Sequence, residues 1–234
     1  MIKKKNFIFP LYKEKGMTSN QVLEIIRKIT GIRKVGHAGT LDPLARGVLV
    51  VGIKREATRE LDKIRKQEKE YIAEIKFGFE SETDDEEGKK KKIEIKEVPS
   101  LEKIKKALFD FKGRIWQVPP KYSAVKIKGK EAYKLARKGI DVQIKPRKVL
   151  LKSIEIIKYR FPYLKIRIVC GTGFYVRALA RDLGKKLGTG AYLKDLERIR
   201  VGDFKKKGAW KLKDFKRYYI VNFSNYEKDK KNSF

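Results

Sequence analysis

The residues best suited to chemistry gather in one glycine-rich stretch, GHAGTLDPLARGVLVVG, which runs from Gly36 to Gly52. It holds His37, the single histidine of the chain, and Asp42 between a leucine and a proline. A carboxylate beside apolar residues is costly unless something pairs with it. Asp42 is therefore either part of a structural Asp-Pro turn or a reactive group, and composition alone favours the turn.

The rest of the chain narrows the possible chemistry. One cysteine and one histidine cannot form a zinc site of the usual Cys/His type. A Ser-His-Asp triad would have to use His37, and no serine lies in a G-x-S-x-G elbow. The GTG at Gly171–Gly173 lacks the third glycine of a dinucleotide fingerprint, and no Walker sequence occurs. An enzyme of this composition works with carboxylates, tyrosines and basic side chains.

Charge points to a polyanionic partner. The chain of 234 residues has 60 Lys and Arg against 29 Asp and Glu, a formal net charge of +31. Nucleic acid is the leading partner, because neutralising phosphates releases counterions. A membrane surface is the alternative, but no apolar run approaches the roughly 20 residues that span a bilayer. The apolar run near the start of the chain is interrupted at Pro10, too early for a signal peptide. The lone Cys170 fits a reducing cytoplasm.

Three further segments favour a functional interpretation over a structural one. QVPPKYSAVKIKGKEAYKLARKG (Gln117–Gly139) interleaves aromatic and basic residues, as nucleic-acid surfaces do. Arg177 and Arg181 lie four residues apart, on the face of a predicted helix opposite its leucines. The ring of Tyr71 could pack in the core or stack on a base.

Hydrophobic periodicity and capping residues predict the elements that position these groups. Strands outnumber helices and often follow one another directly, so we expect an α+β fold with a mixed, largely antiparallel central sheet flanked by helices. The predicted helices are 17–31, 100–113 and 174–187, and the predicted strands are 48–53, 71–79 and 163–170.

Four blocks together resemble the TruB family of tRNA pseudouridine synthases. They occur in the family's order and cover the chain to about Phe204: GMTSNQVL, GHAGTLDPLARGVLVVG, PPKYSAVKIKGKEAYKLARKG and GTGFYVRALARDLG. The resemblance implies a pseudouridine synthase fold and isomerisation of uridine 55 in the T-loop of tRNA, without a metal or a cofactor. It also implies a cytoplasmic enzyme that acts on the T-arm, and we expect a monomer.

The resemblance assigns roles residue by residue. Asp42 matches the catalytic aspartate, and Arg177 matches the arginine paired with it. Tyr71 matches the tyrosine that stacks on the flipped base, and Tyr175 matches a tyrosine near the bound nucleotide. The other substrate-binding residues that it implies are His37, which packs with the T-loop RNA, Lys13 of an N-terminal block, and Tyr122 and Lys126 of a mobile insertion that clasps the T-loop.

The same resemblance suggests the domain organisation. We expect a catalytic domain over residues 1–215, with the insertion at about 117–140, and a polar, frayed basic tail over 216–234. The chain departs from the family pattern at Glu14, where proline is usual, and in GIKREAT, which is one residue longer than the usual loop. We also expect a short form that lacks the family's C-terminal RNA-binding extension.

Two further functions stay open. Relatives that modify ribosomal RNA share the glycine-rich block, and a non-catalytic RNA-binding protein would have the same excess charge. The combination of Asp42, Tyr71 and Arg177 favours the enzyme, because a binding protein has no need of a carboxylate facing phosphates. The sequence leaves open whether Asp42 attacks C1′ as a nucleophile or removes the C2′ proton to give a glycal.

Overall fold

The computed structural model describes residues 7–127 and 129–231, with side chains described as far as Val221. The chain divides into two compact units. The first consists of Met1–Lys69 and Glu197–Phe234, and the second of Glu70–Leu196. The prediction of one catalytic domain over residues 1–215 stays a prediction.

The first unit is built around strand β3, which pairs with β1 and β2 in antiparallel fashion and with the end of β12 in parallel fashion. Its elements are β1 (Phe7–Lys13), α1 (Ser19–Thr30), β2 (Val35–His37), β3 (Arg46–Ile53), α2 (Arg55–Arg65), the last residues of β12 (Ala191–Val201), β13 (Phe204–Lys205), a short 3₁₀ helix (Lys206–Gly208) and α6 (Leu212–Lys231).

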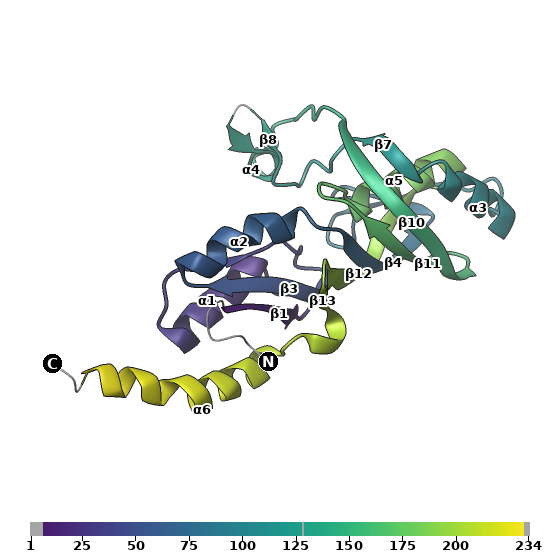
Figure 1. Cartoon of the computed structure of the whole chain (residues 1–234). Coiled ribbons are helices and arrows are strands. Elements are labelled where there is room, and N and C mark those ends of the chain that lie inside the picture. Colours follow the sequence, from purple (N-terminus) through teal and green to yellow (C-terminus); the bar gives the residue numbers. More distant parts are fainter. Residues whose placement is uncertain (1–6, 128, 232–234) are drawn as a thin grey trace. The chain divides into compact units, whose positions relative to one another are not determined.

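Strand β3 is buried on both faces because the first unit packs helices against each of them. Leu49 and Val51 belong to a cluster that includes Val22 and Ile26 of α1. Val48 and Val50 instead join a cluster that contains Leu61 and Ile64 of α2, the helix lying along β3 in Figure 1. The uninterrupted Val-Leu run that predicted a buried strand thus serves two helices, as the alternation of side chains along a strand requires.

Helix α1 begins and ends where the sequence predicts. Thr18 and Gln21 form the expected capping box, with the Gln21 amide donating to Thr18 Oγ1 at 3.1 Å and the Thr18 amide to Gln21 Oε1 at 2.8 Å. The helix ends before Gly31, which is its C-cap. Side-chain capping satisfies amides that have no partner inside the helix.

Two stretches of the first unit differ from the expectation. The end of GIKREAT, interpreted as part of a loop one residue longer than usual, begins helix α2, whose buried residues Ala57, Leu61 and Ile64 recur at helical spacing among charged neighbours. The segment expected to be a frayed polar tail is helical to Lys231. Phe215 anchors this helix α6, since its ring stacks on Phe9 with 4.9 Å between ring centroids and is 1% exposed.

The second unit contains a sheet with the strand order β12-β4-β11-β10-β7. A two-stranded sheet pairs β5 with β6, and another pairs β8 with β9. The elements are β4 (Lys69–Phe77), β5 (Phe79–Ser81), β6 (Lys90–Lys92), α3 (Leu101–Phe109), β7 (Gly113–Gln117), β8 (Lys126–Ile127), β9 (Lys130–Glu131), α4 (Ala132–Ala136), β10 (Arg147–Arg160), β11 (Tyr163–Cys170) and α5 (Val176–Leu187).

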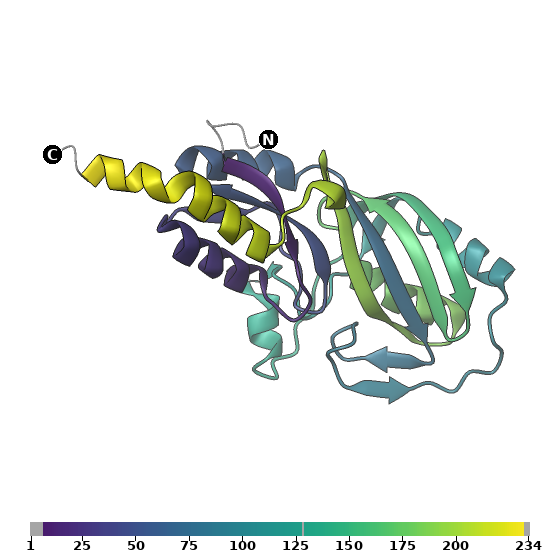
Figure 2. The ribbon, with the colours of Figure 1, turned by 90° about the horizontal axis from the view of Figure 1, so that it is seen from below.

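Antiparallel pairing dominates this sheet. Strands β10 and β11 run side by side over most of their length (Figure 2), and β10 also pairs with β7. On β11 the buried residues Leu164, Ile166 and Ile168 alternate with exposed ones, so one face of the strand meets the core. The expectation of an α+β fold with a mixed, largely antiparallel sheet is confirmed.

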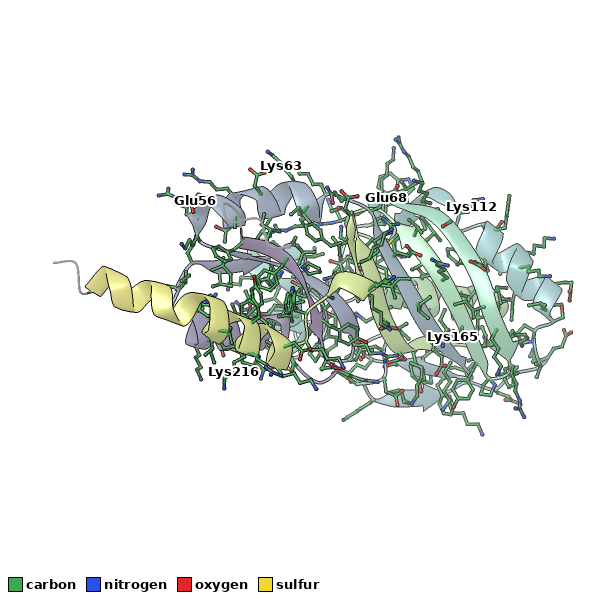
Figure 3. All side chains as sticks on the ribbon, turned by 60° about the horizontal axis from the view of Figure 1, so that its bottom comes forward. Glu56, Lys63, Glu68, Lys112, Lys165 and Lys216 are labelled. Atoms are coloured by element: carbon green, nitrogen blue, oxygen red, sulfur yellow. The ribbon has the colours of Figure 1, made fainter. Side chains whose placement is uncertain are left out.

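Much of the excess positive charge is exposed to solvent. Figure 3 shows Lys63 and Lys216 projecting from α2 and α6 of the first unit. In the second unit, Lys112 follows α3 and Lys165 projects from the exposed face of β11. Among the described helices, none combines the length and the apolar character needed to cross a membrane.

Candidate active site

In the first unit, Asp42 lies on the loop between β2 and β3. The Asp42 carbonyl accepts a hydrogen bond from the Ala45 amide at 3.0 Å, which closes a turn around Pro43. Leu41 and Leu44 are each 3% exposed, whereas Asp42 itself is only half-buried. The loop is thus anchored by apolar side chains on both sides of a carboxylate that keeps access to solvent, an arrangement that fits a reactive group.

The start of helix α1 holds this loop in place. The Ser19 hydroxyl donates to the Leu41 carbonyl at 3.0 Å and accepts from the Leu41 amide at 2.9 Å. The Gly16 amide donates to the Pro43 carbonyl at 2.8 Å. Both contacts fix the backbone immediately beside Asp42. Ser19 did not emerge from the sequence, because a buried serine at a helix start is usually a capping residue.

A second anchor comes from the other end of the chain. Arg198 on β12 is 1% exposed, and its guanidinium donates to the carbonyls of Val48 at 2.7 Å, Thr40 at 3.3 Å and Gly39 at 3.0 Å. Gly39 has a φ of 113°, a conformation that glycine adopts far more readily than other residues. No local pattern in the sequence marks Arg198 for this role, because its partners lie about 150 positions away.

His37 lies at the start of the same loop. Its Nδ1 accepts a hydrogen bond from the Gly39 amide at 3.2 Å. Burial lowers the pKa of His37 to about 4, and the charges of Arg198 and Arg65 act in the same direction. The imidazole is therefore neutral at pH 7, and packing of His37 with the T-loop RNA stays a prediction.

His37 also lines a groove of about 350 Å³ in the first unit. The groove has apolar walls, a carboxylate and two cationic side chains, and its lining residues are Leu23, Lys34, Val35, Gly36, His37, Thr58, Leu61, Asp62 and Arg65. Apolar surface beside cations suits a nucleotide, whose base is apolar on its faces and whose phosphate is anionic.

Lys13, expected to bind substrate, is fully buried at the end of β1. Its ammonium donates to the carbonyl of Glu14 at 3.0 Å and to that of Met17 at 2.7 Å. These bonds shape the turn whose Gly16 holds Pro43. A direct role of Lys13 in RNA binding stays a prediction, and the structure assigns it a part in supporting the Asp42 loop.

In the second unit, Tyr71 lies on β4 and is 8% exposed. It shares the buried face of the strand with Ala73, Ile75 and Phe77, as the alternation in the sequence predicts. That face forms part of the core, so the packing of Tyr71 is established, while stacking of its ring on a base stays a prediction.

Tyr175 and Arg177 lie at the start of α5. The side chain of Gln117 holds the Tyr175 backbone on both sides, donating to its carbonyl at 3.1 Å and accepting from its amide at 2.9 Å. Arg177 is 6% exposed and donates to the Thr83 carbonyl at 3.1 Å and the Tyr122 carbonyl at 3.0 Å. One nitrogen of the same guanidinium pairs with Asp85 at 3.2 Å.

These contacts bring together three predicted residues of the second unit: Tyr122, Tyr175 and Arg177. Asp42 belongs to the first unit and Arg177 to the second. The ion pair between them that the resemblance implies therefore stays a prediction. Within the second unit, the Asp85 carboxylate accepts a hydrogen bond from the Arg177 guanidinium.

The acidic run between β5 and β6 (residues 82–87) is partly buried and not fully exposed to solvent. Asp84 and Asp85 are 9% and 2% exposed, and Arg181 pairs with Asp84 at 2.9 Å. Burial raises the pKa of Asp84 to about 6, against the opposing charges of Arg181 and Arg177. The four-residue spacing of the two arginines places both on one helix face, and their contacts with Asp84 and Asp85 depend on the fold.

The insertion at 117–140 contains little regular structure. Its short strands β8 and β9 pair Lys126 with Glu131, and Lys126 is exposed. The Tyr122 hydroxyl donates to Glu82 at 2.9 Å, and this hydrogen bond is the main cause of its raised pKa. An exposed lysine and a half-buried tyrosine on a thinly structured segment are suited to contact an RNA surface.

Comparison with known proteins identifies the family. Residues 27–176 match the model of the TruB family pseudouridylate synthase N-terminal domain, and residues 177–230 match that of the tRNA pseudouridylate synthase B C-terminal domain. The chain is similar to tRNA pseudouridine synthase B of Clostridium tetani, with 42% identity over 93% of this chain and 75% of that protein. For the enzyme of the same name from Caldanaerobacter subterraneus the identity is 46%, over 89% and 73%.

Solved structures agree on the fold. A chain in the crystal structure of a Cbf5–Nop10–Gar1 complex matches 93% of this chain with a TM-score of 0.71 and 29% identity, and this chain spans 56% of that one. The expected resemblance is confirmed, because the first family model alone covers most of the chain and includes the Asp42 loop, Tyr71 and Tyr175. This chain belongs to the TruB family of pseudouridylate synthases, enzymes that form pseudouridine in RNA.

Proposed function

We propose that this protein isomerises uridine 55 in the T-loop of tRNA to pseudouridine, with Asp42 as the catalytic carboxylate. One observation carries the proposal: two relatives named tRNA pseudouridine synthase B are 42% and 46% identical over most of this chain. The presentation of Asp42 on an anchored loop supports it, since small misplacements of a reacting group cost about 10²-fold in rate.

The reaction makes modest demands on the protein. The bond from C1′ to N1 breaks, the uracil turns, and a bond from C1′ to C5 forms. N1 gains a proton and C5 loses one, so substrate and product are isomers and no oxidant or reductant is consumed. The uridine must first leave its stack. Asp42 either attacks C1′ or removes the C2′ proton, and both routes need its carboxylate ionised near the ribose.

The other predicted residues take supporting roles in this proposal. Tyr71 stacks on the detached base and keeps it within the site. Arg177 provides the positive charge that favours the ionised form of Asp42. Lysines of the 117–140 insertion, Lys126 among them, contact phosphates of the T-arm. The protein acts as a monomer and needs neither a metal nor a cofactor.

A defined set of RNAs tests the function. Purified protein is incubated with a tRNA transcript, the same transcript with cytidine at position 55, and an isolated T-arm stem-loop, and pseudouridine is then mapped by position. We expect product at position 55 of the tRNA and of the stem-loop, and none in the substituted transcript. An inert tRNA, or product at other positions only, would contradict the proposal.

Ribosomal RNA is the second candidate substrate. The solved complex with a TM-score of 0.71 contains Nop10 and Gar1 beside the matching chain. This chain therefore shares its fold with a protein that works within an assembly. Ribosomal RNA fragments in the same assay distinguish the two substrates. Product there, with tRNA left unmodified, would favour this second function.

A further inference from the structure

The side chain of Arg198, a residue that is 1% exposed, contacts the Asp42 loop through its guanidinium. All three of its nitrogens donate, and their partners are the backbone carbonyls of Gly39, Thr40 and Val48. Gly39 and Thr40 lie three and two residues before Asp42, whereas Val48 lies on the strand that follows the loop. One rigid side chain therefore ties the incoming end of the loop to the strand at its outgoing end.

The backbone of Arg198 is fixed as tightly as its side chain. It pairs with Gly47 in the parallel ladder between β12 and β3. Gly47 has a φ of 114°, and a Cβ built there would lie 2.2 Å from the Arg198 carbonyl oxygen. Only glycine permits so close an approach, so the guanidinium starts from an anchored backbone and has little freedom to move.

The choice of arginine fits this arrangement better than a neutral side chain does. A buried cation is costly and is tolerated only when its donors are satisfied. The planar guanidinium directs several N–H groups in fixed directions, whereas a lysine ammonium acts as a point charge on a flexible stem. A forked donor of this kind holds three carbonyls on two separate segments at once, in directions fixed by its plane.

We propose that Arg198 is a positioning residue of the reaction, which sets the Asp42 carboxylate in its reactive place by holding the carbonyls of Gly39 and Thr40. The proposal rests on the proposed function. Arg198 acts through the loop and contacts no substrate. Loss of the forked donor lets the loop relax, so the rate of the chemical step falls while RNA binding by the rest of the surface persists.

Two variants test the role. Arg198→Met removes charge and donors at similar length, and Arg198→Lys keeps the charge but not the fork. We expect each to bind tRNA within about threefold of the unsubstituted protein and to lose about 10²-fold in single-turnover rate at saturating protein. Rates are measured well below the melting temperature of each variant, so that unfolding does not contribute.

A matched control comes from the same unit. Arg27 also donates to two backbone carbonyls, those of Arg33 and Val35, but this segment ends before the Asp42 loop. Arg27→Met should lower the melting temperature without changing the single-turnover rate. A purely structural role of Arg198 would give the same pattern for Arg198→Met, and that result would overturn the proposal.

Chemical rescue provides an independent measurement. In Arg198→Ala, millimolar guanidinium can occupy the vacated space and restore the donors, whereas equimolar potassium or urea cannot. We expect a several-fold rise in single-turnover rate with guanidinium alone. A normal rate for Arg198→Lys, with the unsubstituted protein active, overturns the positioning role and leaves the proposed function intact. An inactive unsubstituted protein refutes the proposed function instead.

Discussion

The Asp42 loop and the 117–140 insertion carry predicted functional residues on opposite kinds of backbone. The loop is held by Ser19, Gly16 and Arg198, and its apolar side chains are almost fully buried. The insertion has strands of two residues and the five-residue helix α4; Val118 and Ile140 near its ends are 41% and 50% exposed, whereas Val125 and Ala132 are buried. A carboxylate that reacts, as we propose for Asp42, must be placed accurately, whereas a segment proposed to contact RNA gains from the ability to adapt.

The contrast predicts that the loop and the insertion affect different steps, the chemical step and RNA binding. Changes in the loop should lower the rate of the chemical step and spare binding. Changes in the insertion should weaken binding and spare the chemical step at saturation.

The largest effect is expected for Asp42→Asn. The amide keeps the size of the carboxylate but is not a nucleophile or a base, so the single-turnover rate should fall by about 10⁴-fold or more. Binding to tRNA and the melting temperature should change little. Appreciable product from the folded variant would remove Asp42 from the reaction, and inactivity through unfolding would restore its interpretation as a structural turn.

Salt should act on binding rather than on the chemical step. With a net charge of +31 and roughly 6–10 phosphate contacts, affinity for tRNA should fall by about 10³–10⁵-fold between 50 and 200 mM salt. The Asp42→Asn variant should show the same slope. Affinity that barely changes over this range would mean that stacking, and not the basic surface, holds the RNA.

His37 in the first unit and Asp84 in the second should change the free energy of unfolding in opposite directions as the pH falls. The folded pKa of His37 is about 4 against 6.5 unfolded, so its contribution to stability is full above pH 6.5 and is lost toward pH 4. The folded pKa of Asp84 is about 6 against 3.8, so its contribution is full below pH 3.8 and is lost as pH rises through 6. Each amounts to about 3 kcal/mol at most.

Urea unfolding at pH 4.5 and pH 7 measures both contributions. His37→Gln should lose less free energy of unfolding on acidification than the unsubstituted protein, and Asp84→Asn should lose more. Asp62→Asn serves as the control, because the Asp62 side chain is 73% exposed. Identical pH dependence in all four proteins would show that neither buried group is coupled to folding.

The smallest effect is expected for Lys126→Gln in the insertion. Loss of one phosphate contact should weaken tRNA binding several-fold and reduce the salt slope by about 1, with an unchanged rate at saturation. Lys63→Gln on α2 is the control, since Lys63 is exposed outside the insertion and pairs with Glu60. Equal effects of the two substitutions would show that charge acts diffusely and that the insertion has no special role.

Local patterns in the sequence were sufficient for the main elements and the family. The capping box at Thr18, the alternation from Tyr71 to Phe77 and the Val-Leu run of β3 all predict the structure observed. Each depends on residues close in sequence, where side-chain geometry limits the backbone to one choice. Helix α2 escaped prediction because charged residues dominate its composition and obscure its three buried positions.

Only the tertiary structure decided how the Asp42 loop is held. Arg198 lies 150 positions from Val48 and donates to backbone carbonyls. Every residue has a backbone carbonyl, so the residue types at these positions do not indicate the contact. The burial of Asp84 and Asp85 likewise depends on Arg177 and Arg181, more than 90 positions away. Contacts between distant segments require the chain to have folded, so the reactive residue could be named from the sequence but its support could not.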